Sequence, residues 1–183
     1  MSPREGTVYN LPMTDFVTLP NHRIREHSDE VRDFGAPLQK LIDELIAVSL
    51  AQKDPPALGM AAPQIGTFKR VFVALIRNKF KPFVNPQIMK YGKDETALLE
   101  GCFSVHGIYG HVMRPSEVEI VAADRNGKKM EMHLKGLAAK IVQHEFDHLN
   151  GGLFIDKIFE QNGKLFRIEK SKDGKETLVE TTI

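Results

Sequence analysis

The apolar residues between positions 37 and 49 follow the repeat of an α-helix. They recur at spacings of three and four residues, at Leu38, Leu41, Ile42, Leu45 and Ile46. This spacing predicts an amphipathic helix, and Pro37 suits its first turn, where the missing N–H would have no partner. The following Asp54-Pro55-Pro56 predicts a loop, because each proline removes a backbone donor and restricts the residue before it.

The chain then changes to a composition typical of β-strands. Residues 70–76 are rich in valine, phenylalanine and isoleucine, and residues 83–89 form a second extended segment. Residues 117–123 and 129–134 flank Asn126-Gly127, a pair that readily adopts the positive φ angles of tight turns. These two segments are therefore expected to form a β-hairpin.

A second helix is expected at residues 137–149. Gly136 precedes this largely apolar segment, and Gly151-Gly152 follows it at the place where helices commonly stop. The apolar residues 153–155 read as a short strand. From about residue 160 the chain is polar and rich in lysine, so this tail is expected to hold one weak strand or helix and little core.

Composition and charge narrow the function classes. The 183 residues, 42% of them hydrophobic, suit a single domain over 1–183, and the chain has no internal repeat. A formal charge of +1 gives no strong field for nucleic acid or an anionic membrane. The apolar runs are too short to span a bilayer, and no secretory signal is apparent. The single cysteine fits a reducing, cytoplasmic setting.

The strongest chemical signal is the H-E-x-x-H sequence at residues 144–148, within the second predicted helix. His144 and His148 are four residues apart, so both imidazoles lie on one helix face and can reach one metal ion. Two such histidines can also bond to each other or to a backbone carbonyl. Glu145 lies on a mostly apolar helix, where a buried carboxylate needs a partner such as a water on the metal.

A catalytic metal site needs a third protein ligand. Zinc endopeptidases commonly take it from a helix further along the chain, but Gly151-Gly152 interrupts the chain here, so the third ligand is expected upstream. Cys102 is the only cysteine, and thiolate is a strong metal ligand. Alone it would read as a small buried hydrophobic residue; beside the histidine pair it becomes the candidate ligand.

Three short sequences, in order, resemble the signature motifs of the peptide deformylase family. They are G-x-A-A-P-Q at residues 59–64, E-G-C-x-S at residues 100–104 and Q-H-E-x-D-H at residues 143–148. The first could otherwise be a plain surface loop. The similarity extends from the first predicted helix to residue 156 and fades in the N-terminal stretch and the tail.

The resemblance implies an α+β fold in which antiparallel strands surround a central helix carrying the H-E-x-x-H motif. It also implies a metal held by Cys102, His144 and His148, with Glu145 as the acid–base residue. Oxyanion donors would be the Gln64 side-chain amide and the Phe103 backbone N–H. A substrate pocket is implied at Gly59, Leu58, Leu98, Leu137 and Ile141.

The implied reaction removes the formyl group from N-terminal formyl-methionine of nascent polypeptides and releases formate. The resemblance implies that the enzyme meets its substrate at the ribosome, and neither nucleic acid nor a membrane is expected as a partner. One sulfur and two nitrogens suit zinc (Zn2+), nickel (Ni2+), cobalt (Co2+) or iron (Fe2+), and kinship favours iron(II). The chain departs from the family pattern next to the predicted site, where Ala57 replaces a glycine and Phe103 a leucine; His106 and Tyr109 also differ from the usual residues. An inactive, metal-binding relative that binds peptide N-termini and a zinc endopeptidase remain as alternatives.

Overall fold

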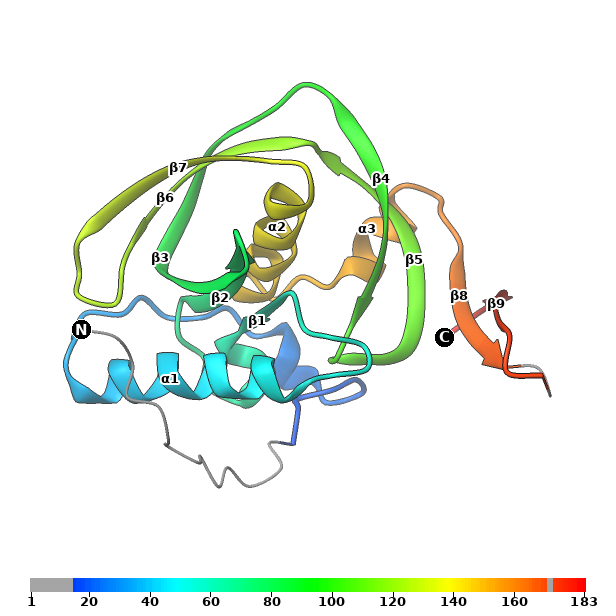
Figure 1. The fold of residues 1–183 in the computed structure, drawn as a ribbon, viewed down its shortest axis with the longest axis horizontal. Helices are drawn as coiled ribbons and strands as arrows, with labels where there is room; N and C mark the ends of the chain where they lie inside the picture. The colour runs from blue at the N-terminus through cyan, green and yellow to red at the C-terminus, as the bar shows by residue number, and fades with distance from the viewer. Residues whose placement is uncertain (1–14, 171–172) are drawn as a thin grey trace.

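The computed structural model describes residues 15–170 and 173–183 and has an α+β fold with two antiparallel sheets. The first sheet has the order β1-β2-β3-β6-β7, formed by Gly59–Ala61, Val71–Ile76, Lys79–Tyr91, Glu117–Ala123 and Lys129–Lys135. The second has the order β4-β5-β8-β9, formed by Glu95–Cys102, Val105–Pro115, Leu165–Lys170 and Glu176–Thr181. The predicted antiparallel strands around a central helix are confirmed, since the strands surround α2 (Leu137–Leu149) (Figure 1).

The strand β2 explains how helices come to cover both faces of the first sheet. Its alternate residues Phe72 and Ala74 pack in the cluster that contains α2, whereas Val71 and Val73 pack in the cluster that contains α1 (Ala36–Ala51). Side chains point to opposite faces at successive strand positions. An unbroken apolar run is therefore what a strand buried on both sides requires.

The helix α2 ends where a glycine is required. Gly151 has a φ of 73°, and a Cβ there would lie 2.2 Å from the backbone oxygen of Arg25. Arg25 belongs to the short 3-10 helix η1 (His22–Arg25), so the turn after α2 packs tightly against the N-terminal part of the chain. The expected stop at Gly151-Gly152 is confirmed.

The expectation of a strand at residues 153–155 is wrong, because Phe154–Glu160 forms the helix α3. A short apolar run cannot by itself distinguish a strand from a helix. The residue that favours a helix here is Asp156. Its carboxylate accepts a hydrogen bond from the N–H of Leu153 at 2.8 Å and thereby caps the start of the helix. Phe154, Ile155 and Ile158 are then buried in a third cluster.

The predicted hairpin of β6 and β7 is confirmed, but its turn differs from the expected one. Of the Asn126-Gly127 pair only Gly127 has a positive φ, at 81°. The Asp124 carboxylate organises the loop by accepting from the N–H groups of Asn126 and Lys128 at 2.8 and 3.0 Å. A side chain thus replaces the tight two-residue turn.

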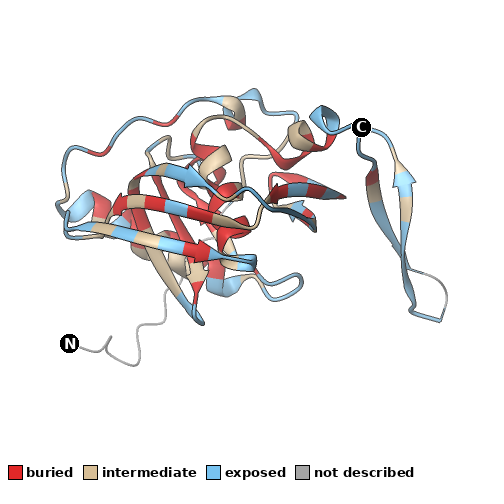
Figure 2. Ribbon diagram, turned by 90° about the horizontal axis from the view of Figure 1, so that it is seen from above, coloured by how far each residue is buried: buried red, intermediate tan, exposed pale blue. Residues whose placement is uncertain are grey.

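The tail forms two strands, not the one weak element expected. The hairpin of β8 and β9 pairs with β5 only at Tyr109 and Gly110 and extends away from the rest of the molecule (Figure 2). Leu165 is its one buried residue among those described, which agrees with the expected lack of core. Within residues 15–170 and 173–183, no helix combines the length and apolar character needed to cross a bilayer.

Candidate metal centre and active site

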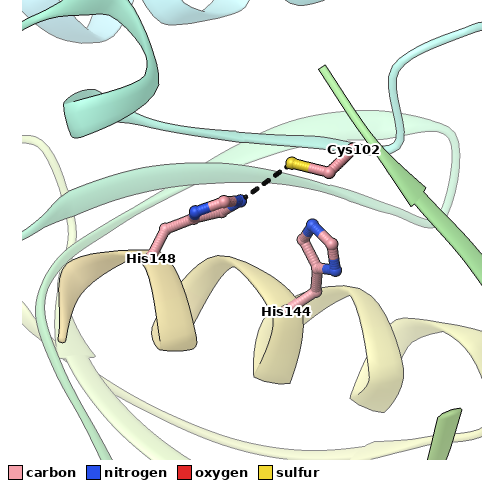
Figure 3. Close-up of side chains that lie close together, drawn as sticks. All are labelled: Cys102, His144 and His148. Carbon is pink, nitrogen blue, oxygen red and sulfur yellow. Dashed lines mark hydrogen bonds between the residues drawn. The ribbon is translucent and has the colours of Figure 1, made fainter. Parts of the chain in front are cut away.

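Cys102, His144 and His148 converge in the structure, although β4 carries the cysteine and α2 carries both histidines. Their sulfur and nitrogen ligand atoms all lie within 4.8 Å of one another (Figure 3). Cys102 Sγ is 3.2 Å from His148 Nε2, and the two imidazole rings have centroids 5.0 Å apart. The third ligand therefore lies upstream of the histidines, as the sequence predicted.

The donor set fits a divalent metal. One thiolate and two imidazoles are ligands that zinc and other first-row metals accept, and a fourth position would remain for water or substrate. Burial disfavours ionisation of Cys102, but the charges and hydrogen bonds of His148 and His144 outweigh burial and hold the pKa of the thiol well below its usual value. The thiolate form, which binds metals, is thus the favoured one.

A buried network of ion pairs holds His144 through the ring nitrogen that does not face the metal position. The Nδ1 atom of His144 lies 2.9 Å from Glu100 Oε2, which leaves Nε2 to face the metal position. Glu100 also accepts two hydrogen bonds from the Arg114 guanidinium, at 2.6 and 3.0 Å. Arg114 donates in addition to Asp147, 2.7 Å away. Such partners fix the orientation of a ligand imidazole.

The charges of this network are matched inside the protein. Burial opposes ionisation of Glu100, but hydrogen bonds from His144 and Arg114 prevail and lower its pKa to about 2. Burial also disfavours the charged form of Arg114, yet its bonds to Glu100 and Asp147 raise its pKa. Both side chains are almost fully buried, with 3% of Arg114 and 5% of Glu100 exposed. The network therefore holds buried charges of opposite sign that stabilise one another.

Glu145 is buried beside the metal ligands and has a free oxygen. Its Oε2 atom has no hydrogen-bond partner among the described residues. Burial raises the pKa of Glu145 to about 7, although His144 and His148 act in the opposite direction. A buried carboxylate with an unused acceptor requires a polar partner. A water at the open metal position would be such a partner.

Gln64 lies against the cysteine ligand. It belongs to the 3-10 helix η2 (Ala62–Ile65), and its Oε1 accepts a hydrogen bond from the N–H of Ala61 at 2.8 Å. This bond fixes the amide so that Nε2 points at Cys102 Sγ, 3.4 Å away. Phe103 follows Cys102 directly, in the turn that joins β4 to β5. The Gln64 amide thus contacts the cysteine sulfur, and Phe103 is the next residue along the chain.

The predicted pocket residues are distributed over three elements near the site. Leu137 and Ile141 share the stripe of α2 that continues to His144 and His148, and Leu137 is half exposed. Leu98 is partly buried and lies on the same face of β4 as Glu100. Leu58 directly precedes β1 and is 38% exposed. Gly59 lies directly against the carboxylate of Glu145.

Both departures next to the predicted site are accommodated. Ala57 is buried in the cluster around α1 and is not among the described residues with positive φ, so its methyl group causes no backbone strain. The Phe103 ring stacks on Phe16, with centroids 5.1 Å apart and an angle of 19° between the planes. The larger side chain at this position is therefore matched by an aromatic partner.

Comparison with known proteins decides the family. The family model described as polypeptide deformylase matches residues 13–164. The chain belongs to the peptide deformylase family. The peptide deformylase of Mesorhizobium japonicum is 39% identical over 153 residues, which cover 81% of this chain and 85% of that protein. The peptide deformylase of Chromobacterium violaceum is 33% identical over 172 residues, covering 92% and 100% of the two chains.

Solved structures agree with this assignment. A peptide deformylase from Thermotoga maritima superposes with a TM-score of 0.75 at 31% identity, over 80% of this chain and 98% of that one. The Plasmodium falciparum peptide deformylase in complex with an inhibitor gives a TM-score of 0.71 at 39% identity, over 78% and 87%. The protein is accordingly a metal-dependent hydrolase with peptide deformylase activity.

Several residues around the site had not been assigned any role from the sequence. Glu100 and Asp147 lie inside recognised motifs, so their spacing relative to Cys102 and His148 was an available signal. Arg114 lies in β5, outside all three motifs, and only the folded structure brings it to them. Phe16 lies in the N-terminal stretch, where the resemblance had faded. These residues support the site and do not belong to the ligand set.

Proposed function

We propose that this protein removes the formyl group from the N-terminal formyl-methionine of nascent polypeptides and releases formate. The observation that carries the proposal is the convergence of Cys102, His144 and His148 beside the unpartnered carboxylate of Glu145. Deformylation is hydrolysis of an amide, and it needs an activated water, a proton carrier and stabilisation of a negative oxygen. Each requirement has a candidate group in this site.

Glu145 is proposed as the proton carrier. A divalent metal held by Cys102, His144 and His148 would supply Lewis acidity toward water and the formyl oxygen. Glu145 would take a proton from the attacking water and later deliver it to the departing amine. A pKa raised by burial to about 7 suits both directions of transfer at neutral pH.

Gln64 and Phe103 are proposed as donors to the negative oxygen that develops on the formyl group. The Gln64 amide is held by Ala61 with its N–H atoms directed toward Cys102. The Phe103 backbone N–H would be the second donor, from the turn that follows Cys102. Because such donors are fixed before the reaction, the loss of one typically costs about a hundredfold or more in rate.

The peptide is proposed to bind in an extended form between two sheet edges. β1 is an edge strand of the first sheet and β4 is an edge strand of the second. Gly59 of β1 lies against Glu145, and Cys102 ends β4, so both edges lead to the site. An extended peptide can pair with such an edge through its backbone. The methionine side chain would lie against Leu58, Leu98, Leu137 and Ile141.

Kinship supports iron(II) as the native metal, although zinc, nickel and cobalt suit the same ligands. We further propose that the protein acts in the cytoplasm, on chains that emerge from the ribosome. The single cysteine supports a reducing compartment. Metal analysis of protein purified without oxygen would test the first proposal, and cell fractionation with ribosome pelleting would test the second.

The decisive experiment for the proposed function measures formate released from a formyl-methionyl peptide by protein loaded with iron(II) or cobalt. The variant Glu145→Gln keeps the shape of the side chain but removes its basicity, so its kcat should fall by at least about a hundredfold while metal content stays unchanged. Glu160→Gln, at an exposed position, is the matched control. Full activity of Glu145→Gln would refute the assigned role, and no formate from the native protein would refute the reaction.

A further inference from the structure

Residues 16–19, called here the bridging segment, join the two loops that carry the proposed oxyanion donors. The N–H of Val17 donates to the backbone oxygen of Gln64 at 2.8 Å, and the N–H of Leu19 donates to the backbone oxygen of Ser104 at 2.9 Å. Gln64 is next to β1 of the first sheet, whereas Ser104 is in the turn between β4 and β5 of the second. One short stretch of backbone therefore connects both sides of the site.

The side chains of the bridging segment are anchored in two different hydrophobic clusters. Phe16 packs against the cluster around α1, as Phe103 does, and their rings stack with centroids 5.1 Å apart. Val17 and Leu19 pack against the cluster around α3 and β5. Stacked aromatic pairs are worth more than their buried area alone. The segment is thus held at both ends while it spans the site.

The separation of the two donors depends on contacts of this kind. Among the described strands, β1 and β4 belong to different sheets and are not paired. Besides the 3.4 Å contact of the Gln64 amide with Cys102 Sγ, the bridging segment is thus a direct backbone link between the loop of Gln64 and the turn at Phe103. Both donors must lie about 2.7–3.1 Å from one developing oxyanion. A misplacement of about 1 Å can cost roughly a hundredfold in rate. A contact that fixes the Gln64 loop relative to the Phe103 turn is therefore expected to raise kcat.

We propose that the bridging segment positions the Gln64 amide and the Phe103 N–H relative to each other, with Phe16 as the positioning residue that holds the Phe103 turn. This inference rests on the proposed function, which makes Gln64 and Phe103 the oxyanion donors. The contact depends on both rings, because an aliphatic residue such as leucine at position 103 could not form the stack. Phe16 acts through Phe103 and does not touch the reacting atoms.

The test compares Phe16→Leu and Phe16→Ala with the native protein. Phe16→Leu keeps an apolar side chain but removes the ring stack, so it remains informative if Phe16→Ala does not fold. Both are expected to lower kcat about tenfold, with KM changed less than about twofold and metal content unchanged. Phe16→Tyr keeps the ring stack at this partly exposed position, so its kcat should equal that of the native protein.

The matched control is Phe34→Ala. Phe34 is another partly buried phenylalanine packed against the same cluster, but its ring lies near Gly127, at the far hairpin turn. It should lower thermal stability as Phe16→Ala does and leave kcat unchanged. In a Phe103→Leu background, Phe16→Ala should cost less than about threefold in kcat, because the contact it removes is already absent.

A second readout does not depend on turnover. In zinc-loaded protein labelled with 15N-phenylalanine, the Phe103 amide signal is assigned by its loss in Phe103→Leu. This signal should shift in Phe16→Leu and stay in place in Phe34→Ala. An unmoved signal with native kcat in Phe16→Leu, a loss confined to KM, or a loss of metal would each overturn the proposal.

A further variant separates this inference from the proposed function. Gln64→Leu should lower kcat about a hundredfold if Gln64 is an oxyanion donor. If Gln64→Leu has native activity, the proposed role of Gln64 fails. If Gln64→Leu loses activity but the Phe16 variants do not, the proposed function stands and only the positioning role of Phe16 is wrong.

Discussion

Glu145 has room in the site only because residue 59 lacks a side chain. A Cβ at Gly59 would lie 2.4 Å from Glu145 Oε1 and 2.8 Å from its Cγ and Cδ. The φ angle of Gly59 is not in the left-handed region, so the glycine is required by the close approach and not by its backbone conformation. A residue expected to contact substrate therefore also sets the position of the proposed proton carrier.

Replacement of Gly59 tests this close contact. Gly59→Ala should displace the carboxylate and lower kcat at least about tenfold, because a positioned proton carrier contributes about a hundredfold or more to the rate. Metal content should not change, since the three atoms nearest the new methyl group all belong to Glu145 and none to a metal ligand. The control Gly35→Ala places its Cβ 3.0 Å from the movable carboxylate of Asp33 on the surface. Equal kcat for the two variants would show that Glu145 tolerates the displacement.

Single residues were predictable where a motif fixed them. The four-residue spacing of His144 and His148 places them on one face of any helix, so their convergence needed no knowledge of the fold. Cys102 could be added because one thiolate completes that ligand set. Arg114 and Phe16 could not be predicted, since each reaches the site only through the way the sheets and the N-terminal segment pack.

At the scale of elements, two strands and one helix contact one another through the ion pairs of Arg114. Arg114 comes from β5, Glu100 from β4 and Asp147 from α2, and the same carboxylate of Glu100 contacts His144. The elements α2 and β4, which carry the metal ligands, are thereby joined by ion pairs. Breaking a buried pair by removing one partner is strongly destabilising, because the other charge remains buried.

This network can be tested by unfolding zinc-loaded variants in urea. Arg114→Met should lower the free energy of unfolding by about 3–5 kcal/mol, because it leaves Glu100 without its buried partner. Arg114→Lys keeps a positive charge but cannot donate in a fork and should lose less. Arg167→Met breaks an exposed pair with Glu169 and should cost less than about 1 kcal/mol. Similar losses for Arg114→Met and Arg167→Met would contradict a structural role for the network.

Elements with a clear apolar pattern were predicted, whereas short or more polar ones were not. The spacing of apolar residues identified α1, apolar composition between flanking glycines identified α2, and β-branched and aromatic runs identified β2 and part of β3, but β4 and β5 were not predicted. The error at Phe154–Glu160 arose because three apolar residues fit either a strand or a helix. In the tail, strands β8 and β9 carry charged side chains that form an ion pair across the hairpin, between Lys170 and Glu176. Their polarity had concealed their regular structure.

At the scale of the whole molecule, a bound metal would join the two sheets. Cys102 ends a strand of the second sheet, whereas His144 and His148 lie on the helix that packs against the first. A ligand that binds only the folded state stabilises it in proportion to the logarithm of its concentration over its Kd. The metal is therefore expected to contribute to stability as well as to catalysis.

Metal removal tests this connection. Chelation of zinc-loaded protein should lower Tm by roughly 5–10 °C, as expected for the loss of about 2.7 kcal/mol of binding energy in a chain of this size. Zinc should restore the native Tm. In Cys102→Ala the zinc-dependent shift should be much smaller, because one of the three ligands is missing. An equal shift in this variant would show that zinc stabilises the protein from another site.

The arrangement of the sheets could not be derived from the residues. Local patterns predicted β2, part of β3, β6 and β7, and the family resemblance supplied the antiparallel layout around α2. Nothing in the spacing of apolar residues specified that β6 pairs with β3, across the two strands that lie between them in the sequence. Pairing over such distances depends on how the whole core closes around Val142, Phe72 and their neighbours.

The central claim is that Cys102, His144 and His148 bind one divalent metal, and X-ray absorption spectroscopy of the zinc-loaded protein tests it most directly. The account predicts one sulfur at about 2.3 Å and two imidazole nitrogens at about 2.0–2.1 Å. The sulfur contribution should disappear in Cys102→Ala. A native spectrum with only nitrogen and oxygen around the metal would contradict the account.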